Sequence, residues 1–280
     1  MKLSRCFLLC ACIAGSCTSD SAPETRVLGP VPELGVRRTT APPRIDGRLG
    51  DRVWQQANGT GRFVETRFGG ESALQASAKL LWDRDHLYVA VDVRDPLLVA
   101  SHTERDSHLW EQDCVELMID PDGDAKSYFE IQLSPRGVVF DTRFDQRRRP
   151  PPYGRVDWDA RMRAAVDVRG TLDDEASDAG YSVELAIPWH AFSLRGAAVG
   201  APQIGDRWRF NVYAIDLGRG QQRAAAWSPL GMGDFHVPSR FGILRFEGEA
   251  EPIKPRIAPS HSPKPDVEHR QRLESSGAGH

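Results

Sequence analysis

Residues 110–141 read WEQDCVELMIDPDGDAKSYFEIQLSPRGVVFD, and this stretch decides the fold class of the chain. Apolar and polar side chains alternate along residues 114–119 and again along 128–133, which is the two-residue period of half-buried strands. The sequence PDGD between the two segments is typical of a turn. A second turn, SPRG, leads into an apolar run at 138–140. The stretch therefore predicts a β-hairpin followed by a third strand.

The predicted hairpin carries more polar side chains than a strand pair needs. Glu116, Glu130 and Gln132 alternate with its apolar residues, and Trp110 stands at its start. Hydrogen-bonding groups beside an aromatic ring indicate a binding surface, and this is the first indication of function.

Short alternating segments continue along most of the remaining chain. They occupy residues 76–82, 87–93, 162–168, 181–187, 208–214 and 241–246. Many short strands separated by turn signals, with almost no helical periodicity, predict an all-β fold. We expect an antiparallel β-sandwich of the immunoglobulin-like or jelly-roll type with one or two short helices, one of them near Trp54, whose side chain should face inward.

Composition predicts one folded domain between two non-globular ends. We expect a lipoprotein signal peptide at 1–17, a flexible tether at 18–40, the sandwich at 41–248 and a disordered Pro-rich tail at 249–280. The formal net charge of −3 reflects nearly balanced acidic and basic residues. Because the chain shows no basic stripe interleaved with aromatic residues, no nucleic-acid partner is expected.

The first 17 residues have the organisation of an export signal. Lys2 and Arg5 precede a short apolar run, and small residues lead to Cys17. This pattern predicts lipidation of Cys17, an exported, membrane-anchored bacterial lipoprotein in the periplasm or on the cell surface, and membrane contact through the lipid alone. Conventional cleavage after Ala-Gly-Ser is the alternative, and it would give a secreted protein. Cys114 is the only cysteine of the predicted sandwich and is expected to be a buried thiol.

Several segments, taken in order, resemble the family 9 carbohydrate-binding modules. They are IDG at 45–47, WQQA at 54–57, LLWD at 80–83, YFEIQ at 128–132, YSVELAIPW at 181–189 and DFHVPSRFG at 234–242. The likeness spans about residues 40 to 247. It implies a non-catalytic β-sandwich that binds the ends of oligo- or polysaccharide chains between two tryptophans, holds structural calcium and supports glycan breakdown.

The chemistry of a sugar ring fits this resemblance. A pyranose presents C–H faces to aromatic planes and hydroxyl groups to carboxylate, amide and guanidinium groups. Trp110 and Trp227 resemble the stacking pair of the family. Glu116, Gln132, Arg136 and Asn211 are the candidates, by analogy, for the groups around the ring, with solvated strand faces as the alternative for each. Trp82, Trp158, Trp189 and Trp208 are expected in the core.

Three other kinds of site are weaker in this sequence. The carboxylates of residues 120–124 have the density of a calcium loop but lack the EF-hand pattern. A haem-binding electron-transfer sandwich remains an alternative with Met232 and His236 as the axial couple, although no Cys-x-x-Cys-His occurs. A glycoside hydrolase is a third reading, because Glu116 and Glu130 are paired carboxylates, but no nucleophile-elbow or zinc motif accompanies them.

Overall fold

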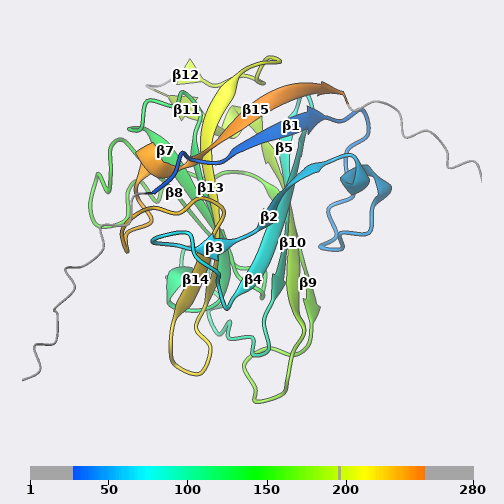
Figure 1. Ribbon diagram of the computed structural model, residues 1–280, viewed down its shortest axis with the longest axis vertical. Helices are drawn as coiled ribbons and strands as arrows, with labels where there is room; N and C mark the ends of the chain where they lie inside the picture. The colour runs from blue at the N-terminus through cyan, green and yellow to red at the C-terminus, as the bar shows by residue number, and fades with distance from the viewer. Residues whose placement is uncertain (1–27, 195–196, 250–280) are drawn as a thin grey trace, which may run out of the picture. The chain divides into compact units, whose positions relative to one another are not determined.

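The computed structural model describes residues 28–194 and 197–249, and within these the protein is all-β (Figure 1). The first half of the described chain contains β1 (Glu33–Arg38), η1 (Arg52–Gln55), β2 (Asn58–Arg62), β3 (Val64–Glu65), β4 (Gln75–Trp82), β5 (His86–Arg94), η2 (Leu109–Glu111), β6 (Cys114–Asp120), β7 (Tyr128–Leu133) and β8 (Val139–Phe144). The second half contains β9 (Arg163–Arg169), β10 (Gly180–Pro188), η3 (Trp189–Ala191), β11 (Ser193–Leu194), β12 (Ala197–Ala198), β13 (Arg207–Asp216), β14 (Arg223–Ala226), η4 (Pro238–Arg240) and β15 (Gly242–Glu249).

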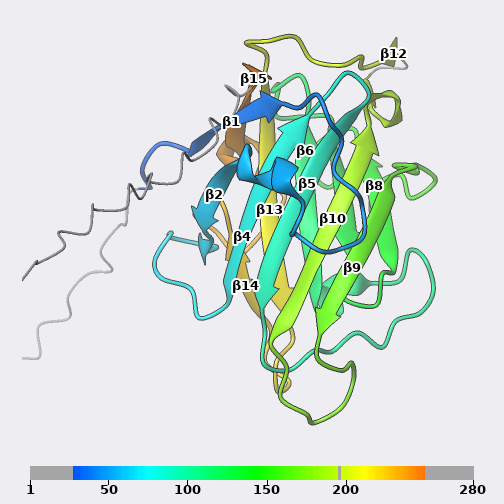
Figure 2. The same ribbon diagram turned by 90° about the vertical axis from the view of Figure 1, so that its right-hand side faces the viewer.

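One long sheet folds over to form both layers of a sandwich. Its strand order is β8-β7-β6-β13-β15-β1-β4-β5-β10-β9, with β2 added at β4 and with β14 pairing both β13 and β3. The views in Figures 1 and 2 show the β4, β5, β10 and β9 strands running side by side as one layer. The main core combines Leu117, Ile131 and Val212 from one half of the sheet with Leu80 and Leu185 from the other. The prediction of an all-β sandwich is confirmed.

Strand register separates the two faces of the β6–β7 hairpin. Leu117 lies opposite Ile131, and Glu116 lies opposite Gln132. Because side chains alternate along a strand, the first pair points into the main core and the second pair points to the outer face of the sheet. β13 continues this arrangement, with Tyr213 opposite Glu116. The outer face of β6, β7, β8 and β13 therefore carries the polar groups that the sequence placed on the hairpin.

The tether prediction for 18–40 is corrected at its C-terminal end. Residues Glu33–Arg38 form β1, which pairs in parallel with both β15 and β4 and so joins the two halves of the sheet. Leu34 and Val36 are buried there, two residues apart as in any half-buried strand. Leu34 and Val36 stand between prolines and the pair Arg37-Arg38, and this apolar pattern is too short to indicate a strand from the sequence alone.

The helices of the described residues are all short 3₁₀ turns, and no α-helix occurs among them. η1 buries Trp54, as predicted. The part of the chain that the structure describes contains no helix that could cross a membrane. The predicted signal peptide, including Cys17, lies outside the described residues. The predicted tail also lies outside them, except for Glu249.

The four tryptophans that were expected in the core pack in or against it. Trp82, Trp189 and Trp208 are buried, and Trp158 packs against the cluster from its edge. The Trp189 and Trp208 rings meet edge to face with their centroids 5.4 Å apart. Such aromatic pairs stabilise a core beyond the area they bury.

Replacing Trp82 with alanine should strongly destabilise the fold. Its ring meets Phe246 edge to face at 5.6 Å, and its Nε1 donates to the carbonyl of Glu247 at 2.9 Å. The substitution would leave both a cavity and an unpaired carbonyl, so we expect the free energy of unfolding to fall by about 3–5 kcal/mol. Urea unfolding of the variant beside the wild type measures this. A loss below about 1 kcal/mol would contradict the core position.

Candidate functional site

A cavity of about 330 Å³ opens on the outer face of the sheet, away from the main core. This volume is at the lower end of the range for small-ligand sites. The cavity combines aromatic walls with a floor of polar side chains. Its lining consists of Trp110, Glu116, Glu130, Gln132, Phe140, Phe144, Arg148, Pro152, Tyr153, Ile215, Gln222, Ala224, Gly233, Phe235 and His236.

Three polar side chains from β6 and β7 form the floor. The amide of Gln132 donates to Oε2 of Glu116 at 2.9 Å and to Oε1 of Glu130 at 2.6 Å. Both amide hydrogens are thereby used. Oε1 of Glu116 and Oε1 of Gln132 remain buried and without a hydrogen-bond partner among the described residues. Because buried polar atoms rarely stay unpaired, the floor is suited to a ligand that supplies hydrogen-bond donors.

Burial controls the protonation of the two floor carboxyl groups. Loss of solvation raises the pKa of Glu116 well above its usual range, and the neighbouring charge of Glu130 raises it further. Loss of solvation also raises the pKa of Glu130, to about 7. Hydrogen bonds to ionised carboxylates oppose such shifts, so a ligand that donates to this floor would favour the charged forms.

Trp110 provides the first aromatic wall and is held on three sides. It lies in η2, its ring stacks on His108 with centroids 4.4 Å apart, and it meets Phe140 and Tyr153 at 5.2 Å each. The side-chain amide of Gln222 donates to its backbone carbonyl. The half-buried indole is therefore positioned before any ligand arrives.

Phe235 provides a second aromatic wall. Its ring stacks on Tyr213 with centroids 4.4 Å apart and an interplanar angle of 5°. Asn211 donates to the hydroxyl of Tyr213, which in turn donates to the carbonyl of Phe235. The wall is thus fixed by a residue of the sheet beneath it.

A salt-bridged loop borders the same cavity. Arg147 and Arg148 both pair with Asp234, each at 2.7 Å. Burial of Asp234 works against its charge, but hydrogen bonds from Arg148 and Arg147 outweigh burial and lower its pKa. The guanidinium of Arg148, which lines the cavity, is therefore already neutralised by a protein carboxylate.

Three of the predicted site residues come together in this cavity, and three do not. Trp110, Glu116 and Gln132 line it. Arg136 instead donates to the carbonyl of Ala100 and pairs with Asp173 at 2.5 Å, which anchors two loops outside the lining. The prediction that Arg136 lies beside the sugar ring is therefore corrected.

Asn211 has a structural position that explains its burial. Its amide donates to Tyr213 and to the carbonyl of Ser228, and its oxygen accepts from the backbone N–H groups of Val212 and Ser228. No donor remains for a ligand, and the expectation that it borders the ring is corrected. It supports the Phe235 wall through Tyr213.

Trp227 is a core residue, and its expected pairing with Trp110 is corrected. Its side chain is 6% exposed and lies in the main core, on the face opposite the cavity. A Cβ on Gly242 would come within 2.5 Å of the indole, so only glycine leaves room for this ring. Ala225 and Trp227 are two residues apart and share the inward face, which the two-residue period could have shown.

Sequence reasoning missed several lining residues. The sequence marks Glu130 as a surplus polar residue of the hairpin, and because it stands two residues before Gln132 it must share the face of Gln132. Tyr153, Arg148 and Phe235 lie in loops, where no period assigns a direction to a side chain. Only the aromatic and basic composition of those loops could have indicated them.

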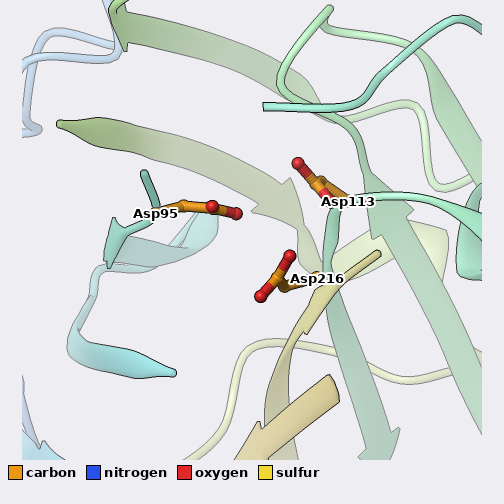
Figure 3. A group of neighbouring side chains, drawn as sticks. All are labelled: Asp95, Asp113 and Asp216. Atoms are coloured by element: carbon orange, nitrogen blue, oxygen red, sulfur yellow. The ribbon is translucent and has the colours of Figure 1, made fainter. Parts of the chain in front are cut away.

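A second polar group lies at the ends of three strands (Figure 3). Asp95 follows β5, Asp113 precedes β6 and Asp216 ends β13, and their ligand atoms lie within 4.8 Å of one another. All three residues are buried. Both oxygens of Asp113 accept backbone N–H groups, from Val99 at 2.7 Å and Leu217 at 2.8 Å.

The carboxylate oxygens of Asp95 and Asp216 have few hydrogen bonds or positive charges to compensate their burial. Oδ2 of Asp95 has no hydrogen-bond partner among the described residues, and Asp216 has only its ion pair with Arg223. Burial raises the pKa of Asp95 to about 6 and that of Asp113 to about 7, and the neighbouring carboxylates add to both shifts. Hard oxygen ligands with unpaired lone pairs suit calcium, so the residues present fit that ion.

The carboxylates of residues 120–124 form a different arrangement. Both oxygens of Asp120 accept backbone N–H groups, from Gly123 and Ala125, each at 2.9 Å. These bonds close the turn between β6 and β7. The turn is therefore held by its own carboxylate.

The fold and the cavity define an all-β binding domain with an aromatic-walled, acceptor-rich site. Residues 45–249 match the family described as carbohydrate family 9 binding domain-like. The chain belongs to this family.

Curated relatives contain the same domain within much longer chains. The endo-1,4-beta-xylanase A of Thermotoga neapolitana is 29% identical over 237 residues, which cover 81% of this chain and 19% of the xylanase. The endo-1,4-beta-xylanase C of Paenibacillus barcinonensis is 34% identical over 212 residues, covering 72% of this chain and 16% of the xylanase. The chain thus spans less than a fifth of the length of these relatives.

Solved structures show the same fold. A family 9 carbohydrate-binding module of Caldicellulosiruptor kristjanssonii in complex with cellotriose superposes with a TM-score of 0.56 at 20% identity, covering 80% of this chain and all of the module. The module of that organism in complex with glucose gives a TM-score of 0.55.

The acidic cluster predicts an unusual pH dependence in the presence of a chelator. A carboxyl group with a higher pKa in the folded chain binds more protons there, so the free energy of unfolding falls as pH rises between the two pKa values. Both aspartates have a pKa of about 4 in the unfolded chain. In the folded chain the pKa is about 6 for Asp95 and about 7 for Asp113. We expect thermal melts in EDTA to show lower stability at pH 8 than at pH 5, by on the order of 1–3 kcal/mol.

Asp95→Asn tests the origin of this slope. Asparagine keeps an oxygen for the N–H of Leu97, which now donates to Oδ1 of Asp95 at 3.0 Å, but carries no charge. The slope should become shallower in this variant and stay unchanged in Glu104→Gln, which alters an exposed carboxylate. Equal slopes in all three proteins would contradict the assignment to the cluster.

Proposed function

We propose that this domain is a non-catalytic module that binds the end of an oligo- or polysaccharide chain in the outer-face cavity. One observation carries the proposal: the buried, unpaired acceptors of Glu116 and Gln132 lie in one cavity with the half-buried ring of Trp110. Aromatic planes suit the C–H faces of a sugar, and the acceptors suit its hydroxyl hydrogens. The small volume favours a terminal segment over a long run of chain.

The similar structures support a sugar as the ligand. Their ligands are cellotriose and glucose, so glucose-based oligosaccharides are the first compounds to test. The curated relatives are xylanases, which supports a role beside glycan breakdown and adds xylo-oligosaccharides to the test set. In this proposal Phe235 takes the place that Trp227 was expected to fill.

We further propose calcium at the cluster of Asp95, Asp113 and Asp216. The unpaired oxygen of Asp95 and the incompletely compensated charge of the three buried carboxylates support this ion. Its charge would offset the cost of burying the carboxylates and would hold the ends of β5, β6 and β13 together.

Export and lipidation complete the proposal. The signal-like residues 1–17 and the small residues before Cys17 support a lipid anchor at that cysteine. Such an anchor would place the binding domain at a membrane surface, with conventional secretion as the alternative.

Trp110→Ala should weaken sugar binding while leaving the fold intact. Loss of the ring removes stacking worth about 1–3 kcal/mol, which is about tenfold to hundredfold in affinity. Calorimetric titration of wild type and variant with glucose, cellotriose and xylotriose measures the effect. Trp158→Phe is the control, because Trp158 packs at the edge of the core and does not line the cavity.

Two outcomes would overturn the sugar site. Wild-type affinity in Trp110→Ala would remove the cavity from consideration even if the protein binds sugars. Absence of binding by the wild type, both to these sugars and on a glycan array, would reject carbohydrate recognition itself.

Calcium should raise the melting temperature of the chelated protein. A ligand at one hundred times its dissociation constant stabilises the folded state by about 2.7 kcal/mol, or about 5–10 °C for a domain of this size. Asp95→Asn should reduce the shift, whereas Asp122→Asn in the β6–β7 turn should keep it. Identical melts of the wild type in calcium and in EDTA would contradict a site here.

A further inference from the structure

His236 is a buried histidine whose role the cavity does not yet explain. It follows Phe235, is 7% exposed and lines the cavity beside Glu130. Its ring meets Phe144 edge to face at 4.9 Å and Tyr128 at 5.8 Å. The ring is therefore fixed in orientation by aromatic packing.

The partners of Tyr128 determine which ring nitrogen of His236 carries the proton. The hydroxyl of Tyr128 lies 2.8 Å from Nδ1 of His236, and it accepts the backbone N–H of Arg148 at 3.1 Å. Because a buried hydroxyl needs an acceptor for its own hydrogen, Tyr128 donates that hydrogen to Nδ1. A neutral imidazole then carries its proton on Nε2.

His236 is neutral near pH 7. Burial lowers its pKa to about 3, and the positive charges of Arg148 and Arg147 add to this effect against the opposing charge of Asp234. Nε2 lies 3.7 Å from Oε2 of Glu130, which is too long for a direct hydrogen bond. The described residues therefore offer no hydrogen-bond acceptor to this Nε2–H group, which lies at the wall of a cavity whose floor offers acceptors.

We propose that His236 is a specificity-determining residue that donates its Nε2–H to an oxygen atom of the bound sugar. Glu116 and Gln132 accept hydroxyl hydrogens of the same ring, so the cavity presents acceptors and one donor in a fixed arrangement. This inference rests on the proposed sugar-binding function.

The arrangement also defines the class of sugar. A ring with free hydroxyl groups satisfies both the unpaired acceptors and the histidine donor. An anionic sugar would bring its carboxylate towards Glu116 and Glu130, while the nearby cation Arg148 is already paired with Asp234. The site therefore selects uncharged sugars, and glucuronic acid should bind at least tenfold more weakly than glucose.

Nitrogen-15 spectroscopy of the imidazole rings tests the tautomer without any substitution. In the full chain labelled at histidine, we expect His236 to show a proton-bearing Nε2 and an unprotonated Nδ1, unchanged from pH 5 to pH 8. Addition of cellotriose should shift the Nε2–H resonance of His236 and leave that of the exposed His190 in place. A proton on Nδ1, or titration of the ring within this interval, would overturn the inference.

Two substitutions separate donation from packing. Leucine at this position (His236→Leu) cannot donate, and we expect at least a tenfold loss of cellotriose affinity. Glutamine (His236→Gln) keeps a donor amide and should recover part of the loss, with melting temperatures recorded for both and His190→Gln as the control. Equal affinity in the leucine variant and the wild type would overturn the inference.

The outcomes also distinguish this inference from the proposed function. If cellotriose binds but leaves the Nε2–H resonance unchanged, the role of His236 is wrong and sugar binding stands. If neither cellotriose nor any other sugar binds, the proposed function fails, and with it the role of His236, whatever tautomer the free protein shows.

Discussion

The two-residue alternation of the β6–β7 hairpin is the constraint on which the rest of the structure depends. It sends Leu117 and Ile131 into the main core and, at the neighbouring positions, Glu116 and Gln132 to the outer face. A shift of register by one residue would exchange the two sets, burying carboxylates in the core and exposing aliphatic side chains. The same alternation therefore determines both the packing of the sandwich and the composition of the cavity floor. Burial of the apolar residues fixes the strand register, and the register places the polar side chains on the outer face.

The free-energy cost of burying polar groups in this arrangement is concentrated at the buried carboxyl groups. Glu116 and Glu130 share a single amide, and in the acidic cluster the described residues give an ion pair to Asp216 alone, from Arg223. Burying a charge is expensive unless hydrogen bonds or an opposite charge compensate it. Where a protein retains such groups without full compensation, a function is the usual reason, and both groups lie where a ligand could supply what is missing.

The faces of strand residues could be predicted from the sequence, whereas most of the loop residues that line the cavity could not. Period-two alternation assigned Glu116 and Gln132 to one face, and the register confirms that pairing. The same rule, applied from Ala225, places Trp227 in the core. Phe235 and Arg148 owe their positions to Tyr213 and Asp234, partners distant in sequence, and no local pattern encodes such contacts. Pairing of β6 with β13 brings Asp113 and Asp216 together, and Asp95 joins them from the end of β5, which pairs with neither strand.

The two polar groups share structural elements. Asp113 and Asp216 stand at the adjacent ends of β6 and β13, and the cavity lies along the same two strands. Arg223, which pairs with Asp216, follows Gln222, whose amide holds the carbonyl of Trp110. Charge compensation at the strand ends and the position of the aromatic wall therefore depend on one short connection between β13 and β14. Because backbone pairing stops at strand ends, side-chain contacts fix the geometry there: the Asp216–Arg223 ion pair at the acidic cluster and the Gln222–Trp110 hydrogen bond at the wall.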